Sequence, residues 1–246
     1  MRAENKAAVH LVAGGPPELL PDLSRYAGDP AIFWIGIDRG VRYLLHFRIR
    51  PDLAIGDFDS LRPLGELPVE TEILSFPAEK DETDMELALR HALGMNPGII
   101  RIFGATGGRL DHFIANLHLM AKITAAHPEI PLRMFDIHNI LEVKTPGTYE
   151  LPEDPLFPYV SFIPLTSSVE NLTLKGFKYP LDSRHISFGS TLCISNELAG
   201  PAGTYSFAGG ILLVVRSADG PDGERSGRKR GDADESTLFE PRRDFG

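Results

Sequence analysis

The spacing of hydrophobic positions changes twice along the chain. Up to about residue 138, short apolar runs alternate with segments of helical spacing. From there to Arg216, short apolar runs alternate with Gly, Pro, Ser and Asn and show no helical period. Beyond Arg216 the chain is rich in Gly, Asp and Arg and nearly lacks apolar residues. We therefore expect three units, 1–138, 139–216 and 217–246, with a domain boundary near 138–145.

The first unit shows the pattern of an α/β fold. A face of the helical period predicts one helix through Met85, Ala88, Leu89, Ala92 and Leu93, and a second through Phe113, Leu117, Met120 and Thr124. A short helix is expected before Tyr26. Continuous apolar strands between helices are typical of a parallel sheet covered on both faces. The expected strands are Val9–Ala13, Ala31–Ile37, Leu53–Ile55, Glu72–Phe76, Ile99–Phe103 and Leu132–Phe135.

The second unit is expected to be a small all-β sandwich. Its candidate strands are Tyr159–Ile163, Leu172–Leu174, Thr191–Ile194 and Ile211–Val215. The third unit has too few apolar residues to offset the entropy of ordering it, so residues 217–246 are expected to form a disordered tail.

Composition narrows the possible functions. The net charge of -9 argues against a general nucleic-acid binder, while Mg²⁺ and local cations still permit a nucleotide. An acidic field favours a cationic substrate. Cys193 is the only cysteine, which fits a reducing compartment. There is no signal-peptide pattern and no apolar run of membrane-spanning length, so we expect a cytoplasmic protein without membrane contact.

Two carboxylates follow the third predicted strand, in Gly56-Asp57-Phe58-Asp59-Ser60. Asp57 and Asp59 lie on the same side of an extended segment, and a divalent cation would relieve their repulsion. Mg²⁺ commonly takes one or two carboxylates and leaves other positions to water and phosphate. The alternative is a turn in which Asp59 or Ser60 caps a following helix.

A second acidic group opens the helix that carries Met85, in Lys80-Asp81-Glu82-Thr83-Asp84. Asp81 and Asp84 are three residues apart and share a helix face. Taken alone, helix capping explains them better, with Asp81 as the N-cap and Asp84 in the position of a capping-box acid.

A glycine-rich connection joins the fifth strand to the second helix, from Gly104 through Gly107, Gly108 and Arg109 to Asp111 and His112. Glycines let backbone approach phosphate, and an arginine can bind phosphate oxygens with two donors. The segment is neither a Walker loop nor a dinucleotide fingerprint. In the alternative explanation, the segment only connects the strand to the helix. Asp111 then caps the helix, and His112 forms only a local hydrogen bond.

Taken in order, Gly-Asp-x-Asp-Ser, Lys-Asp-x-Thr-Asp and Gly-Gly-Arg-x-Asp-His resemble the motifs of the thiamine pyrophosphokinase family, from about Val9 to Val215. The resemblance implies an N-terminal nucleotide-binding domain with a parallel sheet, then a small β-sandwich. It also implies a homodimer with shared active sites, Mg²⁺ as cofactor, and transfer of diphosphate from ATP to the thiamine hydroxyl, with AMP as the second product.

The resemblance assigns roles residue by residue. Asp57, Asp59 and Asp84 resemble the metal ligands. The catalytic set would be Asp57, Asp59, Asp81, Asp84, Arg109 and Asp111. ATP would be bound by Asp38, Lys80, Thr83, Gly107, Gly108, Arg109 and His112. Thiamine would be bound by Ser195, Asn196 and Asp84.

The chain departs from the family pattern at two places. Asp38-Arg39-Gly40 stands where family members often have Asp-Gly-Gly, and Arg39 would hinder the approach of a nucleotide. The second unit has no tryptophan to stack on thiamine, which leaves Tyr179 or Phe188. Two other functions stay open: a hydroxymethylpterin diphosphokinase of related fold, and a nucleotide-binding regulator without turnover. The intact acidic cluster speaks against the regulator, because a protein that only binds nucleotide has little need for so many paired carboxylates.

Overall fold

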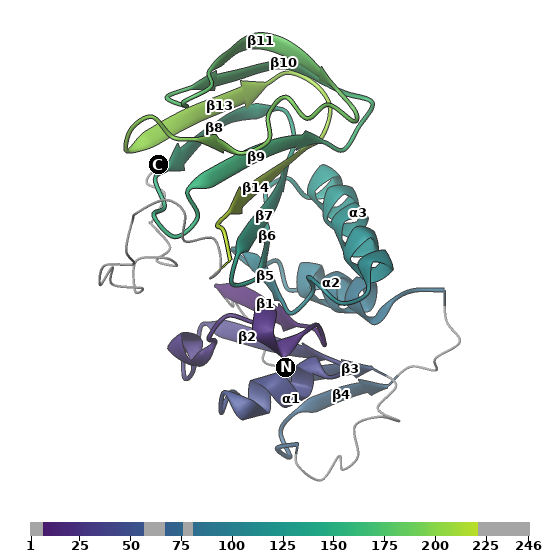
Figure 1. The fold of residues 1–246 in the computed structure, drawn as a ribbon. Coiled ribbons are helices and arrows are strands. Elements are labelled where there is room, and N and C mark those ends of the chain that lie inside the picture. Colours follow the sequence, from purple (N-terminus) through teal and green to yellow (C-terminus); the bar gives the residue numbers. More distant parts are fainter. Residues whose placement is uncertain (1–6, 57–66, 76–80, 221–246) are drawn as a thin grey trace.

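The computed structural model describes residues 7–56, 67–75 and 81–220. In the first half of the chain, strands alternate with helices (Figure 1). The elements there are β1 (Ala8–Val12), two 3-10 helices (Pro17–Leu19 and Ser24–Tyr26), β2 (Ile32–Ile37), α1 (Gly40–His46), β3 (Leu53–Gly56), β4 (Glu72–Ser75), α2 (Asp84–Gly94), β5 (Ile100–Phe103), α3 (Leu110–Ala126) and β6 (Leu132–Phe135).

The second half, up to residue 220, is built from strands. These are β7 (Asn139–Lys144), β8 (Gly147–Pro152), β9 (Tyr159–Pro164), β10 (Ser168–Lys175), β11 (Leu181–Ser187), β12 (Asn196–Glu197), β13 (Ala202–Phe207) and β14 (Leu212–Ser217). All the described strands fall into two sheets. One has ten strands in the order β12-β9-β14-β7-β6-β5-β1-β2-β3-β4, and the other has four in the order β11-β10-β13-β8. The fold is therefore mixed α/β with a large sheet and a second, antiparallel sheet.

Six strands of the large sheet, β6-β5-β1-β2-β3-β4, are parallel to their neighbours. Alternation along β1 gives the sheet its two apolar faces. Val9 and Leu11 pack with α2 and α3, while Ala8 and Val12 share a core with Leu44 of α1. The helices therefore cover both faces of this part of the sheet, which is why its strands read as continuous apolar runs.

A tight hairpin joins the parallel strands to the rest of the sheet. Asp136, which is 5% exposed, accepts hydrogen bonds from the His138 amide at 2.7 Å and from the Asn139 side chain at 3.1 Å. The chain reverses there, and β7 pairs antiparallel with β6. One sheet thus runs through residue 138, and the division into folding units at that point stays a prediction.

The second half is a sandwich in which the extended large sheet forms one layer. β7, β14, β9 and β12 continue that sheet as antiparallel neighbours. Phe162 of β9 and Val214 of β14 pack against Leu172, Tyr205 and other inward residues of the four-stranded sheet. Face-to-face packing of two sheets of this kind buries alternate residues of every strand.

Two sequence expectations about elements were wrong, and one helix was missed. Thr191–Ile194 forms turns rather than a strand: Leu192 and Ile194 are exposed, Cys193 is buried, and Ser195 has φ of 54°. The short helix expected before Tyr26 is two 3-10 helices. α1 was not expected. It has seven residues and buries only Gly40, Val41 and Leu44, and so short a segment does not show a recognisable helical period.

The β-structure extends slightly beyond the expected limit at Arg216. Ser217 belongs to β14, the Ala218 amide donates to the His138 carbonyl at 2.9 Å, and Asp219 accepts from the Tyr159 hydroxyl. The expected start of the tail at residue 217 is therefore too early. Residues 221–246 lie outside the described part. Within the described ranges no helix is long and apolar enough to span a membrane.

A buried cation lies on the α1 side of the sheet. The Arg101 guanidinium, in a residue that is 7% exposed, donates to His10 Nε2 at 3.0 Å. Arginine has no acceptor, so His10 must accept and is neutral. Burial, and then the charge of Arg101, hold the pKa of His10 well below its usual value. The His10 ring packs edge-on against Tyr26 and against the buried Trp34.

A charged group also crosses the β6–β7 pairing. Glu142 forms ion pairs with Arg133, whose Nε lies 2.8 Å from Oε1, and with Lys144, whose Nζ lies 2.5 Å from Oε2; only 16% of the Glu142 side chain is exposed. Burial alone would raise the pKa of Glu142, but Lys144 and Arg133 outweigh burial and hold the pKa below its ordinary value. The folded state therefore favours the carboxylate.

We expect Glu142→Gln to lower the free energy of unfolding by about 2 kcal/mol at neutral pH, because two cations lose a charged acceptor. The folded pKa lies below the unfolded one, so the contribution is present above the ordinary glutamate pKa and is lost as pH falls through the folded pKa. Urea unfolding across a pH series measures this. The exposed Glu150→Gln on β8 is the control; a gap between Glu142→Gln and wild type that persists unchanged at low pH would contradict the assignment.

Candidate active site

The parallel strands bring the predicted site residues to one edge. The chain leaves β1 toward β2 and later returns on the other side of β1 as β5. In open α/β sheets the crevice at such a reversal, at the carboxyl ends of the strands, is where ligands bind. The segments that follow β1, β2, β3 and β5 all start at this edge, and α1, α2 and α3 begin there.

Two glycine-containing segments meet beyond the carboxyl ends of β1 and β5. The Gly15 amide donates to the Gly104 carbonyl at 2.8 Å, and the Ala13 amide donates to the Phe103 carbonyl at 2.9 Å. A Cβ at Gly15 would lie 2.5 Å from the Gly104 oxygen, so only glycine permits this approach. The contact holds the Gly104–Gly108 segment against the end of β1.

Gly107 and Gly108 expose backbone at this edge. Both have positive φ, 70° and 62°, a region that favours glycine. A Cβ at Gly107 would also collide with the Leu19 side chain. The backbone conformation at Gly107 and Gly108 therefore favours glycine, apart from the predicted role of these residues in binding ATP.

Arg109 and Asp111 form a two-point ion pair at the start of α3. Arg109 Nε donates to Asp111 Oδ1 at 3.1 Å, and Nη2 donates to Oδ2 at 2.5 Å. Their side chains are 72% and 63% exposed. The hydrogen bond from Arg109 lowers the pKa of Asp111 to about 2, and the same bond raises the pKa of Arg109. The carboxylate thus orients the guanidinium at the strand edge.

Asp111 is not the helix cap that was the alternative explanation. α3 begins at Leu110 with Arg109 in the N-cap position, and Asp111 accepts from the adjacent His112 amide at 3.0 Å. The exposed side chain of His112 follows in the first turn. Asn116, one turn later, reaches back to the Ala105 carbonyl at 3.5 Å.

At the start of α2, Thr83 is the cap. Its hydroxyl accepts from the Glu86 amide at 3.2 Å, and Asp84 is the first helical residue. The capping alternative, with Asp81 as N-cap, was therefore wrong about which side chain caps. Asp81 is exposed, and Asp84 is half-buried in the first turn of α2. Thr83, and neither of these two carboxylates, therefore caps α2.

Asp38 lies at the ends of β2 and β3. It has φ of 49°, its amide donates to the Ile55 carbonyl at 2.9 Å, and its carboxylate lies against Gly56. Asp57 follows Gly56 directly in sequence. Asp57, Asp59 and Lys80, together with the possible cap at Ser60, lie outside the described residues. Among the residues that are described, no three His, Cys, Asp or Glu side chains form a metal site.

Two further residues shape this edge: Arg39, which the sequence marked only as a departure from the family pattern, and Tyr43, which sequence reasoning missed. Arg39 donates through Nη2 to the Gly14 carbonyl at 2.8 Å, so its side chain lies across the end of β1. The Tyr43 hydroxyl donates to the Gly15 carbonyl at 2.7 Å. Gly14-Gly15 after an apolar run was a usable signal, but Tyr43 sits on the helix that the sequence did not reveal.

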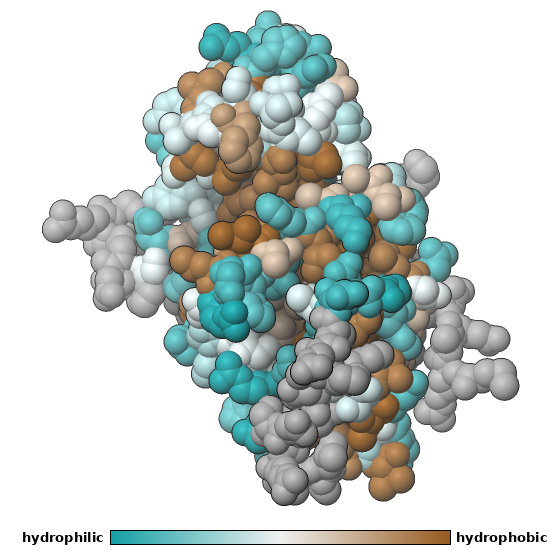
Figure 2. All heavy atoms as spheres, turned by 90° about the vertical axis from the view of Figure 1, so that its right-hand side faces the viewer, coloured by the Kyte–Doolittle hydropathy of each residue, from teal (hydrophilic) through white to brown (hydrophobic). Residues whose placement is uncertain are grey.

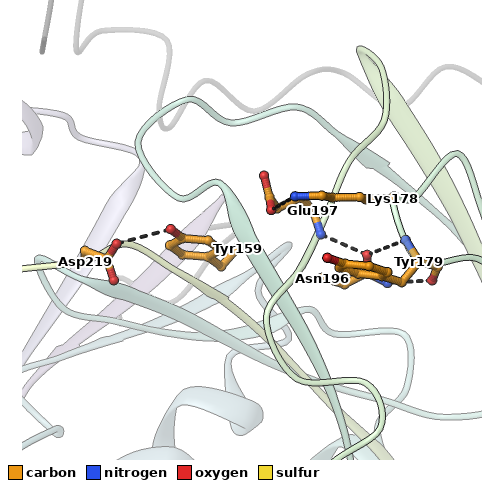
Figure 3. Close-up of polar contacts among 6 residues, drawn as sticks. All are labelled: Tyr159, Lys178, Tyr179, Asn196, Glu197 and Asp219. Atoms are coloured by element: carbon orange, nitrogen blue, oxygen red, sulfur yellow. Dashed lines mark hydrogen bonds and ion pairs between the residues drawn. The ribbon is translucent and has the colours of Figure 1, made fainter. Parts of the chain in front are cut away.

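Two of the predicted thiamine residues, Ser195 and Asn196, lie far from this edge in the strand order, on β12 and the turn before it, whereas the third, Asp84, opens α2. Ser195 is exposed, and its amide donates to the Ser161 hydroxyl at 3.0 Å. Asn196 is 2% exposed and bonds through its side chain to the backbone of Tyr179 (Figure 3). Beside them, Lys178 Nζ lies 2.7 Å from Glu197 Oε1.

Fold and site together define an open α/β sheet, extended by a β-sandwich, with candidate ligand groups at its strand ends. Residues 26–132 match the model of the thiamin pyrophosphokinase catalytic domain, and residues 148–212 match that of the thiamin pyrophosphokinase vitamin B1 binding domain. The chain belongs to the thiamin pyrophosphokinase family.

Individual relatives agree. The chain is 46% identical to a thiamine pyrophosphokinase of Bacillus subtilis over 86% of its own length and 99% of the relative. The crystal structure of a Bacillus subtilis thiamine pyrophosphokinase is similar with a TM-score of 0.79 and 44% identity, covering 86% of this chain and 99% of the other. A Geobacillus thermodenitrificans structure has a TM-score of 0.77 and 46% identity, covering 87% and 99%.

The contact between the two glycine segments predicts a strong effect of Gly15→Ala. A methyl group there would meet the Gly104 and Thr106 carbonyl oxygens at 2.5 and 3.0 Å, so the segments must separate. We expect a loss of about 1–3 kcal/mol in unfolding free energy, measured by thermal and urea unfolding. Gly94→Ala at the end of α2 is the matched control, because nothing lies within 4 Å of its added Cβ. Equal stability of the two variants would contradict the close contact.

Proposed function

We propose that this protein transfers the diphosphate group of ATP to the primary hydroxyl of thiamine, releasing AMP and thiamine diphosphate. The observation that carries the proposal is the ordered match of both family domains to the two halves of the chain. The single cysteine fits a reducing compartment, and we propose the cytoplasm as its location.

The phosphates of ATP would lie at the carboxyl edge of the parallel strands. Backbone at Gly107 and Gly108 permits close approach, and the N-terminus of α3 favours an anion. Arg109 would balance charge on the transferred group, held in orientation by Asp111. His112, Thr83, Asp38 and Lys80 complete the proposed ATP set, Thr83 with its hydroxyl already committed to the α2 cap.

Mg²⁺ fits the donors available at this edge, which are hard carboxylate oxygens. We propose Asp57, Asp59 and Asp84 as its ligands; the position of Asp38 against Gly56 supports a carboxylate-rich end of β3. When bound, the cation would neutralise phosphate charge. Asp81 would extend the acidic set, and one of these carboxylates would accept the proton of the thiamine hydroxyl.

Thiamine would bind at the turn before β12. Ser195 and Asn196 belong to the proposed substrate set, and the ring of Tyr179, which is 59% exposed, offers a stacking surface beside them. Phe188, at 70% exposed, is the other candidate, but no side-chain hydrogen bond ties its backbone to this turn in the described residues. The acidic net charge favours a cationic acceptor.

Sheet order supports sites shared between two copies of the chain. Five strands separate β12 from β1, and six steps of about 4.8 Å correspond to roughly 29 Å along the sheet. Reacting atoms must approach to about 3–3.5 Å. A homodimer that places β12 of one copy at the carboxyl edge of the other would close this distance.

The surface supports the same assembly. Hydrophobic residues gather at mid-height on the face that carries α3 (Figure 2). In the N-terminal part of α3, next to the proposed phosphate site, Leu110 is 67% exposed and Ile114 is 51% exposed. Large exposed apolar residues that gather in this way mark protein interfaces.

We expect thiamine-dependent release of AMP, with thiamine diphosphate as the second product by mass spectrometry. Attack at the β-phosphorus makes AMP the leaving group, so an ATP analogue with methylene between α and β should bind without reacting, whereas one with methylene between β and γ should react. Chelation of divalent cations should stop turnover. ADP as the first product would refute this chemistry, and product formed only with a hydroxymethylpterin would assign the related reaction instead.

Shared sites predict complementation between defective chains. Arg109→Ala damages the ATP half and Ser195→Trp the thiamine half, so each variant alone should be inactive. After subunit exchange, we expect about a quarter of wild-type activity, since half of the dimers are mixed and each holds one intact site. Light scattering and native mass spectrometry verify the dimer and the exchange. Verified mixed dimers without recovered activity would place each site within one chain.

A further inference from the structure

Asn196 belongs to the motif proposed to bind thiamine, yet its side chain is turned inward. It is 2% exposed, and its amide oxygen accepts from the Tyr179 amide at 3.1 Å and the Glu197 amide at 2.9 Å. Its amide nitrogen donates to the Tyr179 carbonyl at 2.8 Å. The side chain therefore bonds to Tyr179 as a neighbouring β-strand would, with one donor and one acceptor (Figure 3).

This contact ends a longer backbone ladder. The Ala199 amide donates to the Gly176 carbonyl at 2.9 Å, and the Lys178 amide donates to the Glu197 carbonyl at 2.8 Å. Buried Phe177 forms a β-bridge with Leu198 between them. At Tyr179 the ladder is continued by the Asn196 side chain instead of backbone, and the next residue, Pro180, has no amide proton to donate.

The residue held in this way is itself exposed. Tyr179 is 59% exposed, and Lys178 Nζ lies 5.6 Å from the centre of its ring while forming an ion pair with Glu197 at 2.7 Å. The backbone of Tyr179 is thus anchored on one side, while its ring faces solvent beside a charged pair (Figure 3). A buried amide whose hydrogen bonds hold an exposed aromatic residue indicates preorganisation of that residue.

We propose that Asn196 is a positioning residue: it holds the Tyr179 backbone so that the aromatic ring forms a fixed stacking surface for the aromatic acceptor. The inference rests on the proposed function for the identity of the acceptor, and reassigns Asn196 from direct contact to action through Tyr179. Holding the ring before binding removes part of the ordering cost that the ligand would otherwise meet.

The first test measures the position of residue 179 without any substrate. In the full chain, Tyr179→Trp adds a fluorophore, and the only native tryptophan, Trp34, is 4% exposed and gives a constant background. Adding Asn196→Ala should lower the fluorescence anisotropy of the indole introduced at position 179 and increase its quenching by acrylamide. Thr173→Val is the matched control, because Thr173 Oγ1 accepts from the Ser183 amide in the same domain without bonding to Tyr179. An unchanged signal from the introduced indole when Asn196→Ala is added would overturn the proposal.

The second test separates positioning from direct contact by kinetics. Asn196→Ala should raise the KM for thiamine roughly three- to tenfold, with kcat and the KM for ATP nearly unchanged, as expected when ground-state and transition-state binding are weakened equally. In a Tyr179→Ala background the same substitution should add no further change, because its effect passes through the ring. An equal rise in KM in both backgrounds would show that Asn196 acts on thiamine by another route.

A conservative variant covers the case in which Asn196→Ala does not fold. Asn196→Asp keeps an acceptor for the Tyr179 and Glu197 amides but loses the donor to the Tyr179 carbonyl, so its anisotropy and KM should lie between those of wild type and Asn196→Ala. Wild-type values in a folded Asn196→Asp would count against the two-sided hold on Tyr179. If the wild-type enzyme shows no thiamine-dependent AMP release, the proposed function fails, while the anisotropy experiment still decides whether Asn196 holds residue 179.

Discussion

The antiparallel pairing of β6 with β7 determines the architecture of the whole chain. Asp136 closes the turn between them with side-chain bonds to His138 and Asn139, and Glu142 crosses the pairing to Arg133. Because β7 adds to the edge of the parallel strands, the second half grows from the first as one sheet. The four-stranded sheet then has an apolar surface, formed by β9 and β14, on which to pack. Without this hairpin, β6 and β7 would each become an edge strand with unpaired backbone groups.

A single sheet also separates the two candidate half-sites. The glycine segments after β1 and β5 lie at the carboxyl edge of the parallel strands, whereas Ser195 and Asn196 lie at β12, the far end of the strand order. The β6–β7 pairing that joins the two halves into one sheet thus keeps their functional groups apart. This separation is the reason for the proposal that a second copy of the chain completes each site.

Several motif residues form hydrogen bonds within the protein. Thr83 caps α2, Asp111 orients Arg109, and Asn196 bonds to the backbone of Tyr179. Each uses its polar atoms within the protein, and each leaves a neighbour in place at the proposed site. A motif read from sequence can therefore include residues whose polar atoms bond within the protein and fix their neighbours in position. Hydrogen-bond geometry identifies such residues.

Local patterns were sufficient to predict the α/β half, six of its strands, two of its helices and the family, because apolar period and short motifs are properties of neighbouring residues. They did not reveal α1, whose seven residues are too few for a period, and they misjudged Thr191–Ile194, where apolar residues lie in turns. Three features required the folded chain: Thr83 rather than Asp81 caps α2, Arg39 and Tyr43 bond to the end of β1, and Asn196 faces inward. The last two depend on partners distant in the chain, up to 28 residues for Tyr43 and Gly15, and such pairings are set by packing and strand order rather than by local preference.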